Sequence, residues 1–185
     1  MDDEIILPGL CDERYEELKT EVANVFERYR VCSLPINAFE LASRMGIHMV
    51  PYLAKPEKAA SLVSYQKDGF SFIRDGETYI YYNDTKKFER QNWTIMHEIG
   101  HRILGHKCES LIAEREADFF AKYALIPPPL VHILGIKTPE EIQRHFIASR
   151  EAAANGMSYY HSWLRHHNKT KFTETEERIL RLFAA

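Results

Sequence analysis

The stretch that decides the fold is Asn92-Trp-Thr-Ile-Met-His-Glu-Ile-Gly-His101, in which two histidines stand four residues apart. In an α-helix, residues four apart lie almost above one another, so His97 and His101 would project from the same face. Two imidazole nitrogens placed in this way can both reach one zinc ion at about 2.0–2.1 Å. The stretch therefore predicts a helix that presents two metal ligands.

Glu98 directly follows the first of these histidines, which places it beside the metal without making it a ligand. Zinc lowers the pKa of a water molecule that it binds to about 7, and a nearby carboxylate can accept the proton of that water at neutral pH. This arrangement is the physical reason why the spacing recurs in metallopeptidases. We therefore expect Glu98 to be the general base of a peptide hydrolysis.

The sequence around the two histidines supports the helix. An apolar pattern with helical spacing runs over residues 88–105, and Gly105 is suited to end it. Trp93, Met96 and Ile99 make this a buried helix. Because unpaired polar groups are costly to bury, two histidines and a glutamate on such a helix need a partner or a ligand.

A second helix, expected at about residues 109–125, carries two carboxylates that could complete a metal site. Glu114 and Asp118 are four residues apart, and small residues beside them, Ala117 and Ala121, would let this helix pack closely against the first. One carboxylate could bind zinc while the other holds a ligand histidine by its second ring nitrogen, with water in the open position. The alternative is that these charges form an ordinary solvated helix face.

The choice of the third ligand rests on helix geometry. Successive residues turn by about 100°, so Glu114 and Glu116 point to nearly opposite sides of their helix. Glu116 shares its side with large aromatic residues, which suit a core contact and would crowd a metal. We expect Glu114 to be the ligand, Asp118 to support a histidine, and loss of the Glu116 carboxylate to leave metal binding nearly unchanged.

The motif around His97, the string Glu114-x-Glu-Ala-Asp-x-Phe-Ala121 and the following Ile126-Pro127 together resemble the ImmA/IrrE family of metallopeptidases. The resemblance implies an α+β, zincin-like fold that is mostly helical, with a small, mainly antiparallel sheet next to the HExxH helix. His97 and His101 match the zinc ligands of the family, Glu98 its catalytic glutamate and Glu114 its third ligand. One Zn²⁺ per chain is implied.

The resemblance also implies a partner. Members of the family act in bacteria, mobile elements and phages, where they cleave helix-turn-helix transcriptional repressors or promote their cleavage. Many relatives carry a repressor-like DNA-binding domain before the peptidase, but the first helices of this chain belong to the peptidase itself. The expected protein substrate is therefore a repressor supplied in trans, in a mobile-element, phage or stress-response circuit.

The rest of the chain indicates one peptidase domain over residues 1–185, with the sheet and metal helices at about 47–125 and a C-terminal helical part at about 129–185. Asp12 and Gly46 are expected to cap the start of the first helix and the end of the second, and Asp68-Gly69 and Asp75-Gly76 to form turns between strands. The expected helices lie at 12–29, 35–45, 88–105, 109–125, 138 onward, 150–165 and 174–183, and the expected strands at 47–52, 61–65, 70–74 and 77–82.

Composition narrows the class of function. A net charge of −3 gives no electrostatic drive toward nucleic acid, three irregularly spaced cysteines do not form a disulfide framework, and no apolar run is long enough to span a membrane. A cytoplasmic protein is the simplest interpretation. Nucleic acid is therefore not an expected partner, and the oligomeric state is left open.

Some assignments stay open. The strand at 77–82 could be a sheet edge that receives an extended peptide or an ordinary internal strand. Tyr82, His145 and His161 are chemically suited to stabilise an oxyanion, while the remaining histidines, His106 among them, are expected at the surface or in the core. The alternative function is a non-catalytic, zinc-stabilised regulator that binds a repressor or DNA. For that alternative, residues 138–166 with the basic run 165–171 could form a helix-turn-helix.

Overall fold

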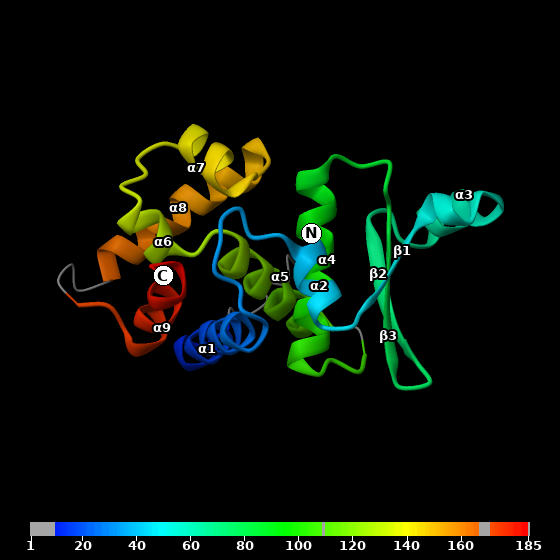
Figure 1. The fold of residues 1–185 in the computed structure, drawn as a ribbon, viewed down its shortest axis with the longest axis horizontal. Coiled ribbons are helices and arrows are strands. Elements are labelled where there is room, and N and C mark those ends of the chain that lie inside the picture. The colour runs from blue at the N-terminus through cyan, green and yellow to red at the C-terminus, as the bar shows by residue number, and fades with distance from the viewer. Residues whose placement is uncertain (1–9, 109, 167–170, 185) are drawn as a thin grey trace, which may run out of the picture.

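The computed structural model describes residues 10–108, 110–166 and 171–184 (Figure 1). Helices come first, then a small sheet, then a longer series of helices, which confirms the α+β class that was expected. The elements are α1 (Asp12–Tyr29), α2 (Ala38–Arg44), β1 (His48–Pro51), the 3₁₀ turn η1 (Tyr52–Ala54), α3 (Pro56–Tyr65), β2 (Gly69–Arg74), β3 (Glu77–Tyr82), α4 (Phe88–Leu104), α5 (Leu111–Leu125), α6 (Pro128–Ile133), α7 (Pro139–Phe146), α8 (Arg150–His166) and α9 (Glu174–Phe183).

The sheet has three strands in the order β1-β3-β2. β2 and β3 form an antiparallel hairpin whose two-residue turn, Asp75-Gly76, has positive φ at both positions, as such turns require. β1 pairs with β3 in parallel, so the sheet is mixed, and the longer pairing, between β2 and β3, is antiparallel. The idea that residues 77–82 form an edge is wrong: β3 is the central strand, and β1 and β2 are the two edge strands.

The strand expected at residues 61–65 is also wrong, because these residues belong to helix α3. Pro56 occupies the first turn, where proline is tolerated, and the alanines that follow favour helix, which outweighs the β-branched Val63. α3 buries none of its residues and projects from the end of the sheet (Figure 1). Asp68-Gly69 is therefore not a turn between two strands, and Gly69 instead opens β2.

Most helix predictions are confirmed, with local corrections. Cys11 rather than Asp12 precedes the first turn of α1, and α2 starts only after Asn37, whose side chain accepts two backbone amide hydrogens. Gly46 has a φ of +71°, as expected for a residue that ends a helix. Helix α6 was missed, because the three prolines at 127–129 read as a stop although prolines fit a first turn.

The C-terminal part consists of packing helices. Thr138 and Thr173 each form the capping box that opens α7 and α9, the second of which was expected from Thr173 and Glu176. α8 packs against both α6 and α7, and Trp163 of α8 donates a buried hydrogen bond to Glu176 of α9. This packing argues against a free DNA-binding unit at residues 138–166. Residues 167–170 of the basic run lie outside the described residues.

Helix α4 lies at the centre of the molecule, between the sheet and the remaining helices (Figure 1). β2 and β3 pack on one side of it, α5 packs on the other, and α1 lies against both α5 and α9. A single cluster of buried side chains continues through these elements. Its largest fully buried members include Leu18, Phe26, Ile80, Ile95, Met96, Ile99, Phe120, Tyr123 and Phe146.

Helices α4 and α5 approach each other closely at Gly100. A Cβ atom added there would lie 3.3 Å from the Cα atom of Ala117 and 3.2 Å from Cδ1 of Phe120. Ala117 and Ala121 are fully buried, which agrees with their expected use as small residues at a close helix contact. The lack of a side chain at Gly100 therefore sets the separation of the two helices.

We expect Gly100→Val to lower the free energy of unfolding by about 1–3 kcal/mol, since extra atoms in a packed interface force the backbones apart. Urea denaturation followed by circular dichroism measures the change. Ala154→Val is the matched control, because Ala154 is exposed on α8 and the same valine there costs less than about 0.7 kcal/mol through helix propensity alone. Equal stability of the two variants would contradict the packing described here.

Candidate metal centre

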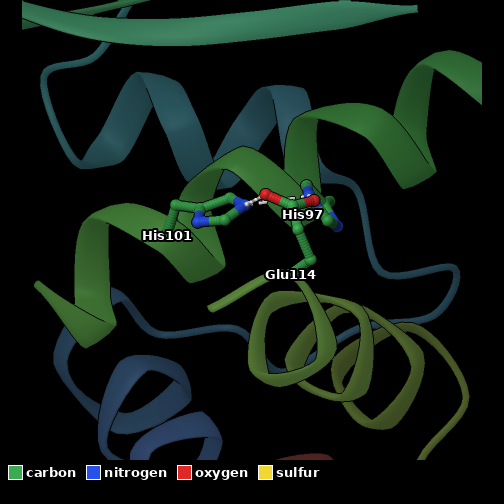
Figure 2. Close-up of side chains that lie close together, drawn as sticks. All are labelled: His97, His101 and Glu114. Atoms are coloured by element: carbon green, nitrogen blue, oxygen red, sulfur yellow. Dashed lines mark hydrogen bonds and ion pairs between the residues drawn. The ribbon is translucent and has the colours of Figure 1, made fainter. Parts of the chain in front are cut away.

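His97 and His101 leave the same face of α4 and point toward α5 (Figure 2). Their Nε2 atoms are 3.0 Å apart. Both side chains are mostly buried, with 15% and 17% of their surfaces exposed. As expected from their spacing, the two histidines place one ring nitrogen each at the same side of the helix, close enough to share a ligand.

Glu114 approaches these nitrogens from the first turn of α5 (Figure 2). Ser110 caps this helix by accepting a hydrogen bond from the Ala113 amide, which fixes where the helix starts. The carboxylate oxygens of Glu114 lie 3.4 Å from Nε2 of His97 and 3.3 Å from Nε2 of His101. Ligand atoms of the three residues all fall within 4.8 Å of one another.

These separations suit a tetrahedral metal ion. Donor atoms that each lie about 2.0–2.1 Å from a zinc ion at tetrahedral angles are about 3.3 Å from one another. The two Nε2 atoms are 3.0 Å apart, Nε2 of His97 lies 3.4 Å from Oε2 of Glu114, and Nε2 of His101 lies 3.3 Å from Oε1, so all three side chains could reach one cation. The donor set of two imidazoles and one carboxylate is that of catalytic rather than structural zinc sites.

Asp118 lies where the sequence predicted it, one turn beyond Glu114. Its Oδ1 is 2.9 Å from Nδ1 of His97, so the carboxylate accepts the Nδ1 proton, and Nε2 of that ring faces Glu114. Burial lowers the pKa of His97, but the hydrogen bond to Asp118 and the charges of Glu98, Asp118 and Glu114 outweigh it. The net pKa lies above the ordinary value.

Glu98 lines the same cleft as the two histidines and contacts the sheet. Its Oε2 accepts a hydrogen bond of 2.6 Å from the hydroxyl of Ser71 on β2, and its side chain is largely buried. Burial raises the pKa of Glu98, against the opposing effects of Ser71 and His97. A carboxylate with a raised pKa is a stronger base than an ordinary one.

His106 is a neighbour of this centre that the sequence reading missed. Gly105 adopts a φ of +70° and ends α4, and the chain then turns back so that Nδ1 of His106 lies 2.9 Å from Nδ1 of His101. On its other side, Nε2 of His106 is 2.9 Å from Glu116. Burial, together with His97 and His106, lowers the pKa of His101 to about 4. A histidine directly after a helix-ending glycine was the available signal.

The candidate ligands face a cleft of about 430 Å³ between β2, α4 and the start of α5. Gly69 and Ser71 of the edge strand line it, together with Trp93 and the exposed Cys108. The three residues considered for oxyanion stabilisation, Tyr82, His145 and His161, are not among its lining residues. None of these three residues is therefore assigned to oxyanion stabilisation.

Residues 58–158, more than half of the chain, match the peptidase M78 family, whose description is the IrrE N-terminal-like domain. The chain belongs to this family. The resemblance inferred from the motifs is thereby confirmed, as is the zincin-like α+β fold. This family membership makes the protein a metallopeptidase-type hydrolase that acts on a protein substrate.

The matched segment of this M78 peptidase contains the edge strand, α4 and α5, and therefore all three candidate ligands. No curated protein matches the chain. Within the ranges 10–108, 110–166 and 171–184, no helix has the length and apolar character needed to cross a membrane.

Removal of the Glu114 carboxylate should weaken zinc binding most. We expect Glu114→Ala to raise the dissociation constant for zinc more than 100-fold, and Asp118→Ala to raise it about 10–100-fold, as is typical when a partner of a ligand histidine is lost. Competition with a chromophoric chelator measures both. Glu177→Ala, an exposed glutamate on α9, is the control and should bind like the wild type. A weaker effect for Glu114→Ala than for Asp118→Ala would contradict the ligand assignment.

Proposed function

We propose that this M78 peptidase is a zinc-dependent endopeptidase that cleaves a helix-turn-helix transcriptional repressor supplied in trans. One observation carries the proposal: two imidazoles and a carboxylate converge within 4.8 Å, and the buried Glu98 lies next to them in the same cleft. We also propose that residues 1–185 act as one peptidase domain, which the continuous core supports.

In the proposed site, His97 and His101 hold one Zn²⁺ through their Nε2 atoms and Glu114 holds it through its carboxylate. When bound, the ion would polarise the peptide carbonyl and lower the pKa of the attacking water. Asp118 orients His97 through the Nδ1 hydrogen bond of 2.9 Å. Such partners of ligand histidines hold the ring in place and increase its basicity.

Glu98 is the proposed general base. It accepts one proton from water as the water oxygen bonds to the carbonyl carbon, and it then donates that proton to the peptide nitrogen as the C–N bond breaks. The Ser71 hydroxyl holds one oxygen of the carboxylate during this transfer. Burial of Glu98 raises its pKa, which brings it closer to the value that serves both steps at neutral pH.

The edge strand offers a place for the substrate. β2 pairs with β3 on one side only, and Gly69, Phe70 and Ser71 of β2 line the cleft. An extended peptide could add to such an edge through main-chain hydrogen bonds and pass the candidate ligands. The sequence suggested peptide binding at residues 77–82, but these residues form the central strand β3, so we propose β2 as the peptide-binding edge.

The choice of a repressor as substrate rests on the resemblance to the ImmA/IrrE family. Members of that family act on repressors of mobile elements, phages and stress responses. A repressor acts on DNA inside the cell, so this substrate implies a cytoplasmic reaction. The net charge of −3 gives the protein no electrostatic attraction to the DNA that its proposed substrate binds.

The proposal is tested with Glu98→Gln. We expect this variant to keep the fold and one zinc per chain while cleavage falls by about 10²–10⁴-fold, because the base is lost but the ligands remain. The assay incubates zinc-loaded protein with each repressor encoded beside its gene and identifies cut sites by mass spectrometry. Glu89→Gln, the same substitution in the first turn of α4, serves as control.

Two results would decide against the proposal. Cleavage by Glu98→Gln at the wild-type rate would remove Glu98 from the mechanism. Binding of a neighbouring repressor or its operator DNA without any cleavage, by wild type and variant alike, would favour the alternative of a non-catalytic, zinc-stabilised regulator.

A further inference from the structure

A chain of hydrogen bonds leads from the candidate metal centre to the first helix. Nδ1 of His101 faces Nδ1 of His106 at 2.9 Å, and Nε2 of His106 faces Oε2 of Glu116 at 2.9 Å. Glu116 in turn accepts two hydrogen bonds from Arg14 of α1, from Nε at 2.7 Å and from Nη2 at 2.8 Å. We call His106, Glu116 and Arg14 the relay.

The relay determines which nitrogen of each ring carries the proton. Both oxygens of Glu116 accept a hydrogen bond from the Arg14 guanidinium, as the two oxygens of a carboxylate do, so Glu116 only accepts hydrogen bonds. Nε2 of His106 must therefore carry its proton, and the Nδ1 of this neutral ring accepts. The proton between the two Nδ1 atoms then belongs to His101. His101 is left with an Nε2 lone pair that faces His97 and Glu114.

Burial strengthens this arrangement. Only 12% of the His106 side chain and 10% of the Glu116 side chain are exposed, and hydrogen bonds are stronger where water is excluded. Glu116 would be costly to bury without Arg14, since a buried charge that lacks a partner is strongly destabilising. Arg14 lies outside the residues 58–158 that match the family, so the relay reaches beyond the matched segment.

We propose that His106 and Glu116, held by Arg14, are positioning residues that fix His101 as an Nε2 metal ligand. None of the three belongs to the group of candidate ligands, yet zinc affinity depends on them. The proposal rests on the metal site proposed above. It also replaces the expectation that loss of the Glu116 carboxylate leaves metal binding nearly unchanged, because Glu116 acts on His101 through His106.

Two variants of one residue separate positioning from mere structure. His106→Leu keeps the approximate size of the side chain and removes the acceptor, and we expect it to raise the zinc dissociation constant about 10–100-fold. His106→Asn places an amide oxygen near the position of Nδ1, where it can accept the His101 proton, and should return the affinity to within about threefold of wild type. Glu116→Leu should weaken binding as His106→Leu does.

A stability control excludes general loosening of the fold. Val131→Ala removes buried methyl groups on α6, remote from the metal centre, and should lower the melting temperature without a change in zinc affinity. If Val131→Ala weakens zinc binding as much as His106→Leu, or if His106→Leu binds zinc like the wild type, the proposal is wrong.

A measurement on the metal-free full-length protein distinguishes failure of the relay from failure of the metal site. Nitrogen-15 chemical shifts of the histidine rings report which nitrogen carries the proton, without any metal or substrate. We expect His101 protonated at Nδ1 in the wild type and in His106→Asn, and a mixture of both tautomers in His106→Leu. Wild-type His101 protonated at Nε2 overturns the proposal, even if the protein binds zinc. Nδ1 protonation in a protein that binds no zinc supports the relay and refutes the metal site.

Discussion

The geometry of the site depends on one close contact, that of α4 with α5 at Gly100. The missing side chain lets the backbone of Ala117 approach so closely that a Cβ atom at Gly100 would lie only 3.3 Å from it. Gly100 directly precedes His101, and Ala117 follows Glu114 by nearly one turn of α5. The helix separation at this contact therefore sets the distance from Glu114 to both histidines, and a wider one would carry the carboxylate out of reach of a shared ion.

The candidate metal ligands and the proposed general base lie on different sides of α4. His97 and Glu98 are adjacent, and neighbouring helical residues point about 100° apart. The histidine therefore faces α5 and the carboxylates, while the glutamate faces β2 and the Ser71 hydroxyl. One helix in this way separates the groups that can hold a cation from the group that can move a proton, and the cleft opens where both meet.

Helical periodicity, together with the family resemblance, predicted which side chains lie together, because the face of a residue follows from its position in one helix. It placed His97 and His101 together, chose Glu114 over Glu116, and put Asp118 beside a histidine. The partners that it missed depend on contacts between segments: Ser71 on the pairing of β2, His106 on the left-handed turn at Gly105, and Arg14 on a contact across 102 residues of sequence. The parallel pairing of β1 with β3 was missed for the same reason, since strand order is not encoded in period-two alternation. The helical α3 was missed for a local reason, because Pro56 in its first turn and the alanines that follow favour a helix.

The contact of Arg14 with Glu116 bears on how much of the chain makes up the functional unit. The matched segment ends at residue 158 and does not include α1 or α9, yet α1 packs against α5 and α9, and its Arg14 pairs with the carboxylate of Glu116, whose side chain is only 10% exposed. If α1 were only an appendage, its removal would leave that carboxylate charged and unpaired in the interior, or protonated. In the first case the unpaired charge would destabilise the fold, and in the second Glu116 would no longer be the charged acceptor that fixes the His106 proton. The first helix is therefore tied electrostatically to the candidate metal centre, and this tie argues for one domain rather than a catalytic segment with separate additions.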